Sequence, residues 1–100
     1  HQEDEQFRLM ALKCIYTLLK NNKLTDRPKV FGLLEQIRTN SPQVNIHLLK
    51  IISLLAVDAP AEQLVETYIR TVSGFMLRAT HKTEFDFAEA LCQWMISSLR

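Results

Sequence analysis

Residues 45–57, NIHLLKIISLLAV, contain nine apolar residues among the twelve that follow Asn45. A helix that spans a membrane needs about 18 to 20 uninterrupted apolar residues, whereas this run is shorter and includes His47 and Lys50. On a helix that turns about 100° per residue, its apolar positions occupy most of the circumference. Such a helix is buried against several neighbours, so we expect residues 42–57 to form the central helix of a small domain without membrane contact.

The apolar positions of this helix fall into two groups. The main face is formed by Val44, Leu48, Ile51, Ile52 and Leu55, and the smaller group on the other side by Ile46, Leu54 and Val57. At least two neighbouring segments must therefore cover the helix.

Composition indicates a soluble globular chain. Of its 100 residues, 47% are apolar and 23% charged, which is typical of a single domain. The net charge of +1 creates no strong field toward nucleic acid or lipid. The chain begins HQEDEQF rather than with Met and shows no signal-peptide pattern, so we expect residues 1–100 to be one domain of a longer protein.

The two cysteines lie inside apolar patterns without metal-ligand spacing. We expect Cys14 and Cys92 to be reduced core thiols, which favours an intracellular protein, cytoplasmic or nuclear.

Helix-start signals divide the rest of the chain into an all-α arrangement of five helices. Asp26 or Thr25 is expected to cap the second helix, Ser41 the third, and Asp58 with Pro60 the fourth. Thr83 and Asp86 stand at capping-box spacing near the last. The expected helices cover about residues 5–21, 27–40, 42–57, 59–79 and 84–98.

The first helix is apolar on more than one side. Its core face is predicted to be Phe7, Met10, Ala11, Cys14 and Leu18, widened by Leu9, Leu12, Ile15, Tyr16 and Leu19. We therefore expect this helix to be more buried than a typical surface helix.

The helix starts also repeat. TDRPKVFGLLEQI and VDAPAEQLVETYI both place Pro two residues after Asp, and Asp26 and Asp58 are 32 positions apart. Short connections make sequential helices antiparallel, and stacked helix pairs of about 33 to 47 residues build α-solenoids. In helix lengths, loop lengths and Asp-x-Pro starts, the chain resembles HEAT or armadillo repeats over about two and a half units. This resemblance implies a five-helix stack of hairpins acting as a scaffold that binds proteins or, less often, nucleic acid.

No catalytic motif is visible. His81, Glu84 and Asp86 are interpreted as a solvated turn with a cap, and His47 as a partly buried, hydrogen-bonded histidine. The sequence has no phosphate-binding glycine loop, CxxC or HExxH pattern. We expect neither enzymatic activity nor a cofactor, a metal or a small-molecule substrate.

The last helix has two apolar stripes. Its core face is predicted to be Phe85, Ala88, Cys92, Met95, Ile96 and Leu99, and its second stripe Phe87, Leu91 and Trp94. Exposed apolar stripes containing Trp are typical of interfaces, so we interpret the second stripe as a partner-binding surface. The alternatives are that it packs within the domain, against a second copy in a homodimer, or against adjacent repeats of the parent chain.

Basic residues surround two turns. Lys20, Lys23, Arg27 and Lys29 flank the first turn, which makes RNA or DNA binding, or support of a neighbouring nucleic-acid-binding domain, an alternative function. The second cluster is Arg78, His81 and Lys82. Antiparallel helices place the two clusters at opposite ends of the domain, where they cannot form one groove.

Overall fold

The computed structural model describes the backbone of residues 2–99 and the side chains of residues 4–99, and it is all-helical over that range. The predicted all-α class is therefore confirmed. Residues 61–78 form one continuous helical run that consists of three elements. The elements are α1 (Gln2–Lys20), α2 (Arg27–Glu35), α3 (Pro42–Ala56), α4 (Ala61–Gln63), the π-helical η1 (Leu64–Ile69), α5 (Arg70–Arg78) and α6 (Lys82–Ser97).

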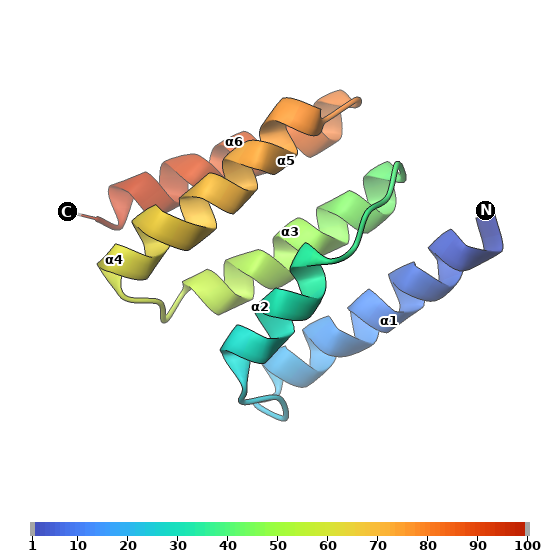
Figure 1. Ribbon diagram of the computed structural model, residues 1–100, viewed down its shortest axis with the longest axis horizontal. Coiled ribbons are helices and arrows are strands. Elements are labelled where there is room, and N and C mark those ends of the chain that lie inside the picture. Colours follow the sequence, from blue (N-terminus) through green and yellow to red (C-terminus); the bar gives the residue numbers. More distant parts are fainter. Residues whose placement is uncertain (1, 100) are drawn as a thin grey trace.

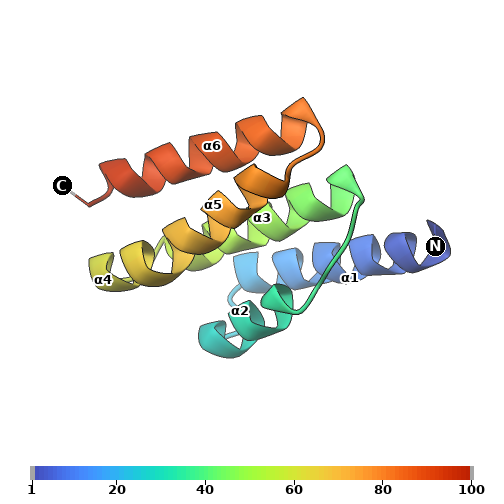
Figure 2. The same ribbon diagram turned by 45° about the horizontal axis from the view of Figure 1, so that its top comes forward.

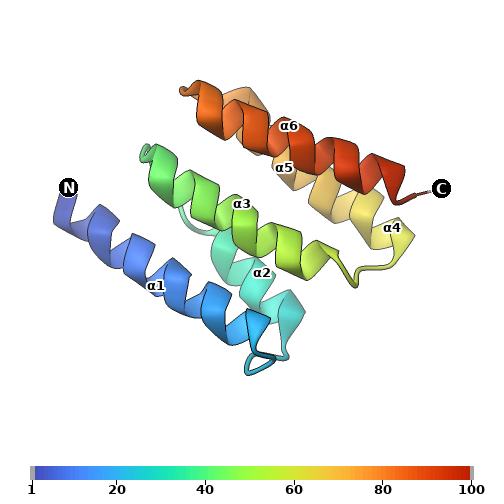
Figure 3. The ribbon, with the colours of Figure 1, turned by 180° about the vertical axis from the view of Figure 1, so that it is seen from behind.

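The helices form two layers. Figure 3 shows α1, α3 and α6 side by side in front, with α2 and the α4–α5 run behind them. The three helices of the first layer run in the same direction, and the two segments behind them run roughly the opposite way (Figures 1 and 2). Sequential helices are thus antiparallel, as the short connections predict.

The middle helix of the first layer holds the core together. α3 contacts α1, α2, η1 and α6, and Leu48, Leu49 and Ile51 are completely buried in it. The expectation that residues 42–57 form a central helix is confirmed. The smaller apolar group is covered incompletely, because Ile46 and Leu54 are half-buried and Val57 is 60% exposed. In residues 2–99, no helix is long and apolar enough to cross a membrane.

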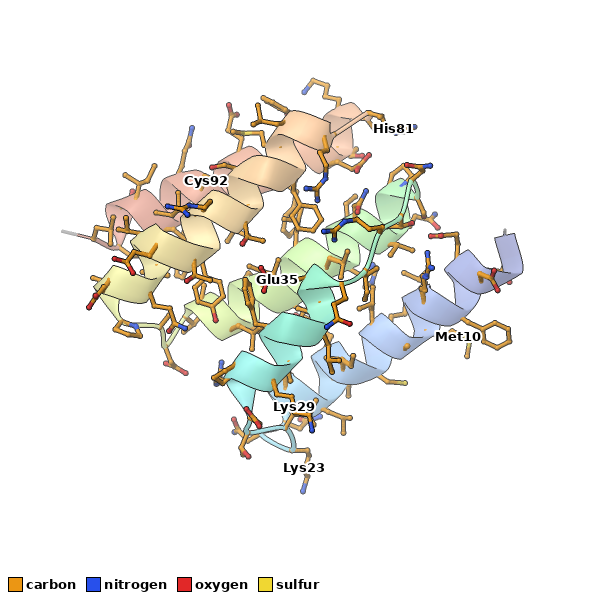
Figure 4. The ribbon with its side chains drawn as sticks, viewed as in Figure 1. Met10, Lys23, Lys29, Glu35, His81 and Cys92 are labelled. Atoms are coloured by element: carbon orange, nitrogen blue, oxygen red, sulfur yellow. The ribbon has the colours of Figure 1, made fainter. Side chains whose placement is uncertain are left out.

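The predicted core face of α1 is wrong. Phe7 is 69% and Met10 63% exposed, and Figure 4 shows Met10 on the outer side of the helix. Leu12 and Leu19, which were expected only to widen the face, are the buried residues. The remaining members of the predicted face, Ala11, Cys14 and Leu18, are exposed too.

Polar contacts at the start of α1 accompany the observed rotation of this helix. Arg8 Nη1 donates to the carbonyl of Arg38 at 3.0 Å, and the Thr39 hydroxyl donates to the Glu5 carboxylate. These contacts tie α1 to the connection between α2 and α3. They occur together with burial of the Leu12 side, although both sides of α1 are apolar enough to be buried.

The two cysteines differ in environment. Cys92 is buried, with Sγ 3.8 Å from the Ser73 hydroxyl of α5. Cys14 is an exposed free thiol, because it lies on the outer side of α1. The prediction of a core thiol is therefore confirmed for Cys92 and wrong for Cys14.

α2 ends earlier than expected, at Glu35 rather than near residue 40. Arg38 Nη1 donates to the carbonyls of Glu35 and Ile37, and the Ser41 N–H donates to the Thr39 hydroxyl at 3.0 Å. Local side-chain bonds of this kind compete with helical backbone bonds. They satisfy the carbonyls of Glu35 and Ile37 and the N–H of Ser41, and residues 36–41 form a connection without helical structure.

Two of the predicted caps are present. The Asp26 side chain accepts the N–H of Lys29, and that of Ser41 accepts the N–H of Val44. Asp58 does not cap α4; instead its carboxylate lies 3.6 Å from Arg27 Nη2. The capping box at Thr83 and Asp86 is also wrong.

α6 begins at Lys82, before the position that a capping box would require. His81 is its N-cap residue, without a side-chain hydrogen bond to the helix start. Asp86 accepts a bond from Lys82 Nζ at 2.6 Å instead.

The predicted helix over residues 59–79 contains an unexpected π-helical segment. It places Tyr68, which is almost completely buried, edge-on to Phe31 of α2, with ring centroids 4.9 Å apart at 70°. This contact joins the two segments of the second layer. The hydrophobic pattern of the sequence does not distinguish a π turn from an α turn, so the prediction did not include it.

The two sides of α1 are expected to respond differently to truncation. Leu12→Ala should lower the free energy of unfolding by about 2 to 5 kcal/mol, because it leaves a cavity against α3. Met10→Ala is the matched control and should change it by no more than about 0.5 kcal/mol, because Met10 is exposed. Urea unfolding of both variants measures the difference, and equal losses would contradict the observed rotation of α1.

Tyr68 is expected to make the fold sensitive to alkaline pH. Burial raises the pKa of its hydroxyl above 10.0, and the nearby positive charge of Arg27 only partly opposes that shift. The folded state therefore favours the protonated form. The resulting stabilisation is complete below the unfolded pKa of about 10 and is lost as pH rises through the higher folded pKa.

Tyrosinate absorbance measures this shift directly. The chain has two tyrosines, so Tyr16→Phe leaves Tyr68 as the sole source of the signal. We expect a midpoint above 10.0 in the folded state. A midpoint at or below 10.0 would contradict the burial argument, and Tyr68→Phe should weaken the loss of stability above about pH 10.

Candidate functional site

An apolar groove lies between the C-terminal half of α3 and α6. It has a volume of about 440 Å³, and its lining contains a single polar side chain, that of Ser53. The other lining residues are Leu54 and Val57 at the end of α3, and Phe87, Ala90, Leu91 and Trp94 on α6. An open apolar groove of this kind is a candidate contact for another molecule.

The structure places the three predicted interface residues at different depths. Trp94 is 41% exposed at the groove, and Phe87 is half-buried. Leu91 is only 7% exposed, so it contributes to the floor of the groove and to the core rather than to a surface stripe. All three line the same groove, but only Trp94 presents a large exposed surface.

The predicted core face of α6 is wrong at two positions. Phe85 and Ile96 are exposed, whereas Leu91 is buried. The buried residues at i, i+3, i+4 and i+7 are Ala88, Leu91, Cys92 and Met95. α6 lies against both α3 and α5, and its rotation directs this row into the space between them.

Sequence reasoning missed the contribution of α3 to the groove. Leu54 and Val57 were recognised as apolar positions off the main face of the central helix, and that was the available signal. The sequence predicts that neighbouring helices cover them. α6 instead covers them only partly, and the uncovered part forms one wall of the groove.

A polar cavity adjoins the apolar groove and shares Ser53 and Phe87 with it. Its volume is about 550 Å³, and it extends across α3 to α1. Lys13 and Lys50 are among its lining residues. The outer face of the first layer therefore combines an apolar end with a basic flank.

His47 also lines this polar cavity. It is half-buried, and its Nδ1 lies 3.0 Å from the Gln43 carbonyl, as expected for a hydrogen-bonded histidine.

The four residues predicted as an alternative nucleic-acid-binding cluster have different environments in the structure. Arg27 Nη1 donates to the Leu54 carbonyl at 3.0 Å, so this guanidinium stabilises the end of α3. The amino group of Lys20 lies 5.7 Å from the centre of the Tyr16 ring. Lys23 and Lys29 are exposed.

The two basic turns lie at opposite ends of the domain. Figure 4 shows Lys23 and Lys29 at one end and His81 at the other. The predicted separation of the two clusters is confirmed.

The interpretation of the second turn as fully solvated is wrong at Glu84. This carboxylate is only 4% exposed, and its Oε2 accepts a hydrogen bond from Asn45 Nδ2 of α3 at 2.8 Å. Its Oε1 lies 3.4 Å from His81 Nδ1 and has no hydrogen-bond partner within residues 4–99. Glu84 thus links the starts of α3 and α6.

Glu84 does not form part of a metal-ligand cluster. Asp86 is paired with Lys82, and no group of three or more potential metal ligands occurs in the described part of the chain. The contacts of Glu84 are those of a structural clamp between two helices.

Comparison with known proteins gives no assignment. No family model matches the sequence, and no curated protein or solved structure matches it either.

The Glu84–Asn45 bond is expected to stabilise the packing of α6 on α3. A double-mutant cycle of Asn45→Ala and Glu84→Ala should give a coupling free energy of about 1 to 3 kcal/mol. Each single substitution leaves the other group, a half-buried amide or a buried carboxylate, without its hydrogen-bond partner. The matched control is the exposed Lys82–Asp86 pair, whose coupling should be much smaller. Urea unfolding measures both cycles. Equal coupling in the two would show that Glu84 is not a clamp.

Proposed function

We propose that the chain is a non-enzymatic protein-interaction module of a larger scaffold or regulatory protein. The observation that carries this proposal is the apolar groove between α3 and α6, with Trp94 at 41% exposure beside Phe87. Trp is enriched among the residues that contribute most to binding free energy. Burial of its exposed ring, together with Leu54 and Val57, would supply the main driving force for binding.

The flank of the groove indicates the kind of partner. Lys13 and Lys50 line the adjoining cavity, and Phe87 separates it from the apolar end. An amphipathic segment with apolar anchors toward α6 and acidic residues toward α1 is complementary to both parts. Electrostatic complementarity of this kind sets orientation and association rate more than affinity.

The layered architecture supports a repeat-like scaffold of the HEAT or armadillo type. α1, α3 and α6 are stacked in parallel, and the oppositely directed segments lie behind them (Figure 3). Arg27 and Asp58 come from the two Asp-x-Pro starts, and their 3.6 Å contact links one proposed repeat to the next. Both edge helices of the first layer carry exposed apolar side chains, which fits a solenoid whose edges are covered by neighbouring repeats.

The proposal includes an intracellular location for the protein. An exposed free thiol at Cys14 fits the reducing interior of a cell, cytoplasmic or nuclear.

Substitution of Trp94 is the direct test. In the protein that carries this domain, Trp94→Ala and Phe87→Ala should each weaken partner binding at least about tenfold, because Trp and large apolar anchors dominate interfaces. The control is Ile96→Ala, which removes an exposed apolar side chain from the same helix outside the groove. Quantitative comparison of co-purified proteins identifies the partners, and titration with each purified partner gives the affinities.

Two further measurements separate the alternatives. Retention of every partner by folded Trp94→Ala and Phe87→Ala variants would contradict the proposal. Sedimentation would show a Trp94-dependent homodimer, and salt-titrated binding to RNA and DNA would show a role for Lys20, Lys23 and Lys29.

A further inference from the structure

We propose that a second cavity, between α2 and α5, binds an acidic side chain of a polypeptide partner. This cavity has a volume of about 200 Å³, and its polar lining includes Arg38 just after α2 and Arg70 and Arg78 on α5. It lies on the side of α3 opposite to the apolar groove, because its walls come from the second layer (Figure 1). The inference therefore goes beyond the proposed function of the groove.

Within residues 4–99, the arginines of this cavity have no carboxylate within ion-pair distance. Elsewhere, Arg8 pairs with Glu5 at 2.8 Å, and Arg27 lies 3.6 Å from Asp58. The arginines that form no ion pair within residues 4–99 are those that line the cavity: Arg38, Arg70 and Arg78. Uncompensated guanidinium groups on two facing elements create a local preference for anions.

Only one acid offsets these charges. Glu35, labelled in Figure 4 at the end of α2, is the sole acidic residue of the lining. The cavity therefore has three cationic side chains and one anionic side chain, although the whole chain has a net charge of +1. The excess positive charge is local, and it arises because α5 and the end of α2 line the same cavity.

Two of the guanidinium groups are already held in place. Arg38 Nη1 donates to the Glu35 carbonyl at 2.5 Å, and the Arg78 guanidinium carbon lies 4.9 Å from the centre of the Phe75 ring. An arginine held in this way loses less conformational entropy on binding, and its remaining N–H groups can donate to an oxyanion. Arg38, Arg70 and Arg78 are all exposed, and together they form the cationic wall.

The other lining residues favour a side chain over a larger ligand. The half-buried Phe75 provides apolar surface beside the buried Phe31 and Ile52, and Thr71 provides a hydroxyl. Gly74 leaves the α5 wall without a side chain. A volume of about 200 Å³ lies below the usual size of a site for a drug-sized ligand or cofactor, but it accommodates one acidic side chain and its methylene groups.

The cavity would recognise an oxyanion that offers two acceptor oxygens to the same guanidinium group. Arginine donates to both oxygens of a carboxylate or of a phosphoryl group, and clusters of arginines recognise acidic or phosphorylated peptides. Aspartate, glutamate and phosphoserine share this chemistry. The apolar surface beside the arginines favours a peptide over a free anion, because the methylene groups of its side chain can pack on that surface.

Arginine-detected NMR tests the proposal with defined probes. Three probes are added separately to the ¹⁵N-labelled domain: a capped hexaglutamate peptide, a peptide with one phosphoserine, and inorganic phosphate. We expect at least one of the peptides to shift the Nε–H signals of Arg38, Arg70 and Arg78 and the backbone signal of Gly74. The relative affinities of the two peptides distinguish a carboxylate from a phosphoryl ligand.

Variants make the test specific to this cavity. Arg70→Gln should raise the Kd of the bound peptide at least about tenfold, and Arg70→Lys should restore part of the affinity, because charge returns without the bidentate geometry. Lys23→Gln is the matched control, since it removes one positive charge at the distant α1–α2 turn. Trp94→Ala should leave peptide binding here unchanged, so a failure of the groove proposal is distinguishable from a failure of this one.

Three results would overturn the inference. The first is equal peptide affinity in the wild-type protein and in Arg70→Gln. The second is a response to inorganic phosphate but to neither peptide, which would indicate a weak ion site only. The third is tighter binding of a single-stranded RNA than of either peptide at the same three arginines, because that would assign the cavity to nucleic acid.

Discussion

Burial of α3 is the constraint on which the rest of the structure depends. Among the helices of residues 2–99, α3 alone contacts α1, α2, η1 and α6. Its side chains Leu48, Leu49 and Ile51 exclude water from both layers at once. Apolar burial of about 25 cal/mol per Å² is non-directional, so it explains why the helices gather around α3 but not how each is rotated.

Polar contacts at the helix ends supply that orientation. Arg8 binds the connection after α2, Arg27 binds the last turn of α3, and Glu84 binds the first turn of α3. Each contact joins segments that are distant in sequence. All three use charged side chains that resemble free surface charges in the sequence, and in the structure each of them joins two segments of the fold.

The helices were predictable because their signals are local. Asp26 and Ser41 cap helices at the expected places, and the apolar circumference of residues 45–57 placed that segment at the centre. Helix rotation was not predictable in the same way. α1 and α6 are apolar on two sides, so periodicity alone could not choose Leu12 over Met10 or Leu91 over Ile96. The groove could be predicted from the sequence only in part. Leu54 and Val57 belong to a different segment from Trp94, and only the tertiary packing of α6 on α3 brings them together.

The exposed sides of α1 and α6 have a consequence for how copies of this chain would assemble. The two helices lie at opposite edges of the first layer, and their apolar residues differ: Phe7 and Met10 on one, Trp94 and Ile96 on the other. A contact between the α6 edge of one molecule and the α1 edge of another is heterologous, so each added molecule presents a fresh edge. Such growth is open-ended and yields chains rather than closed pairs. An internal position within a longer array of helices would occupy both edges and remove that tendency.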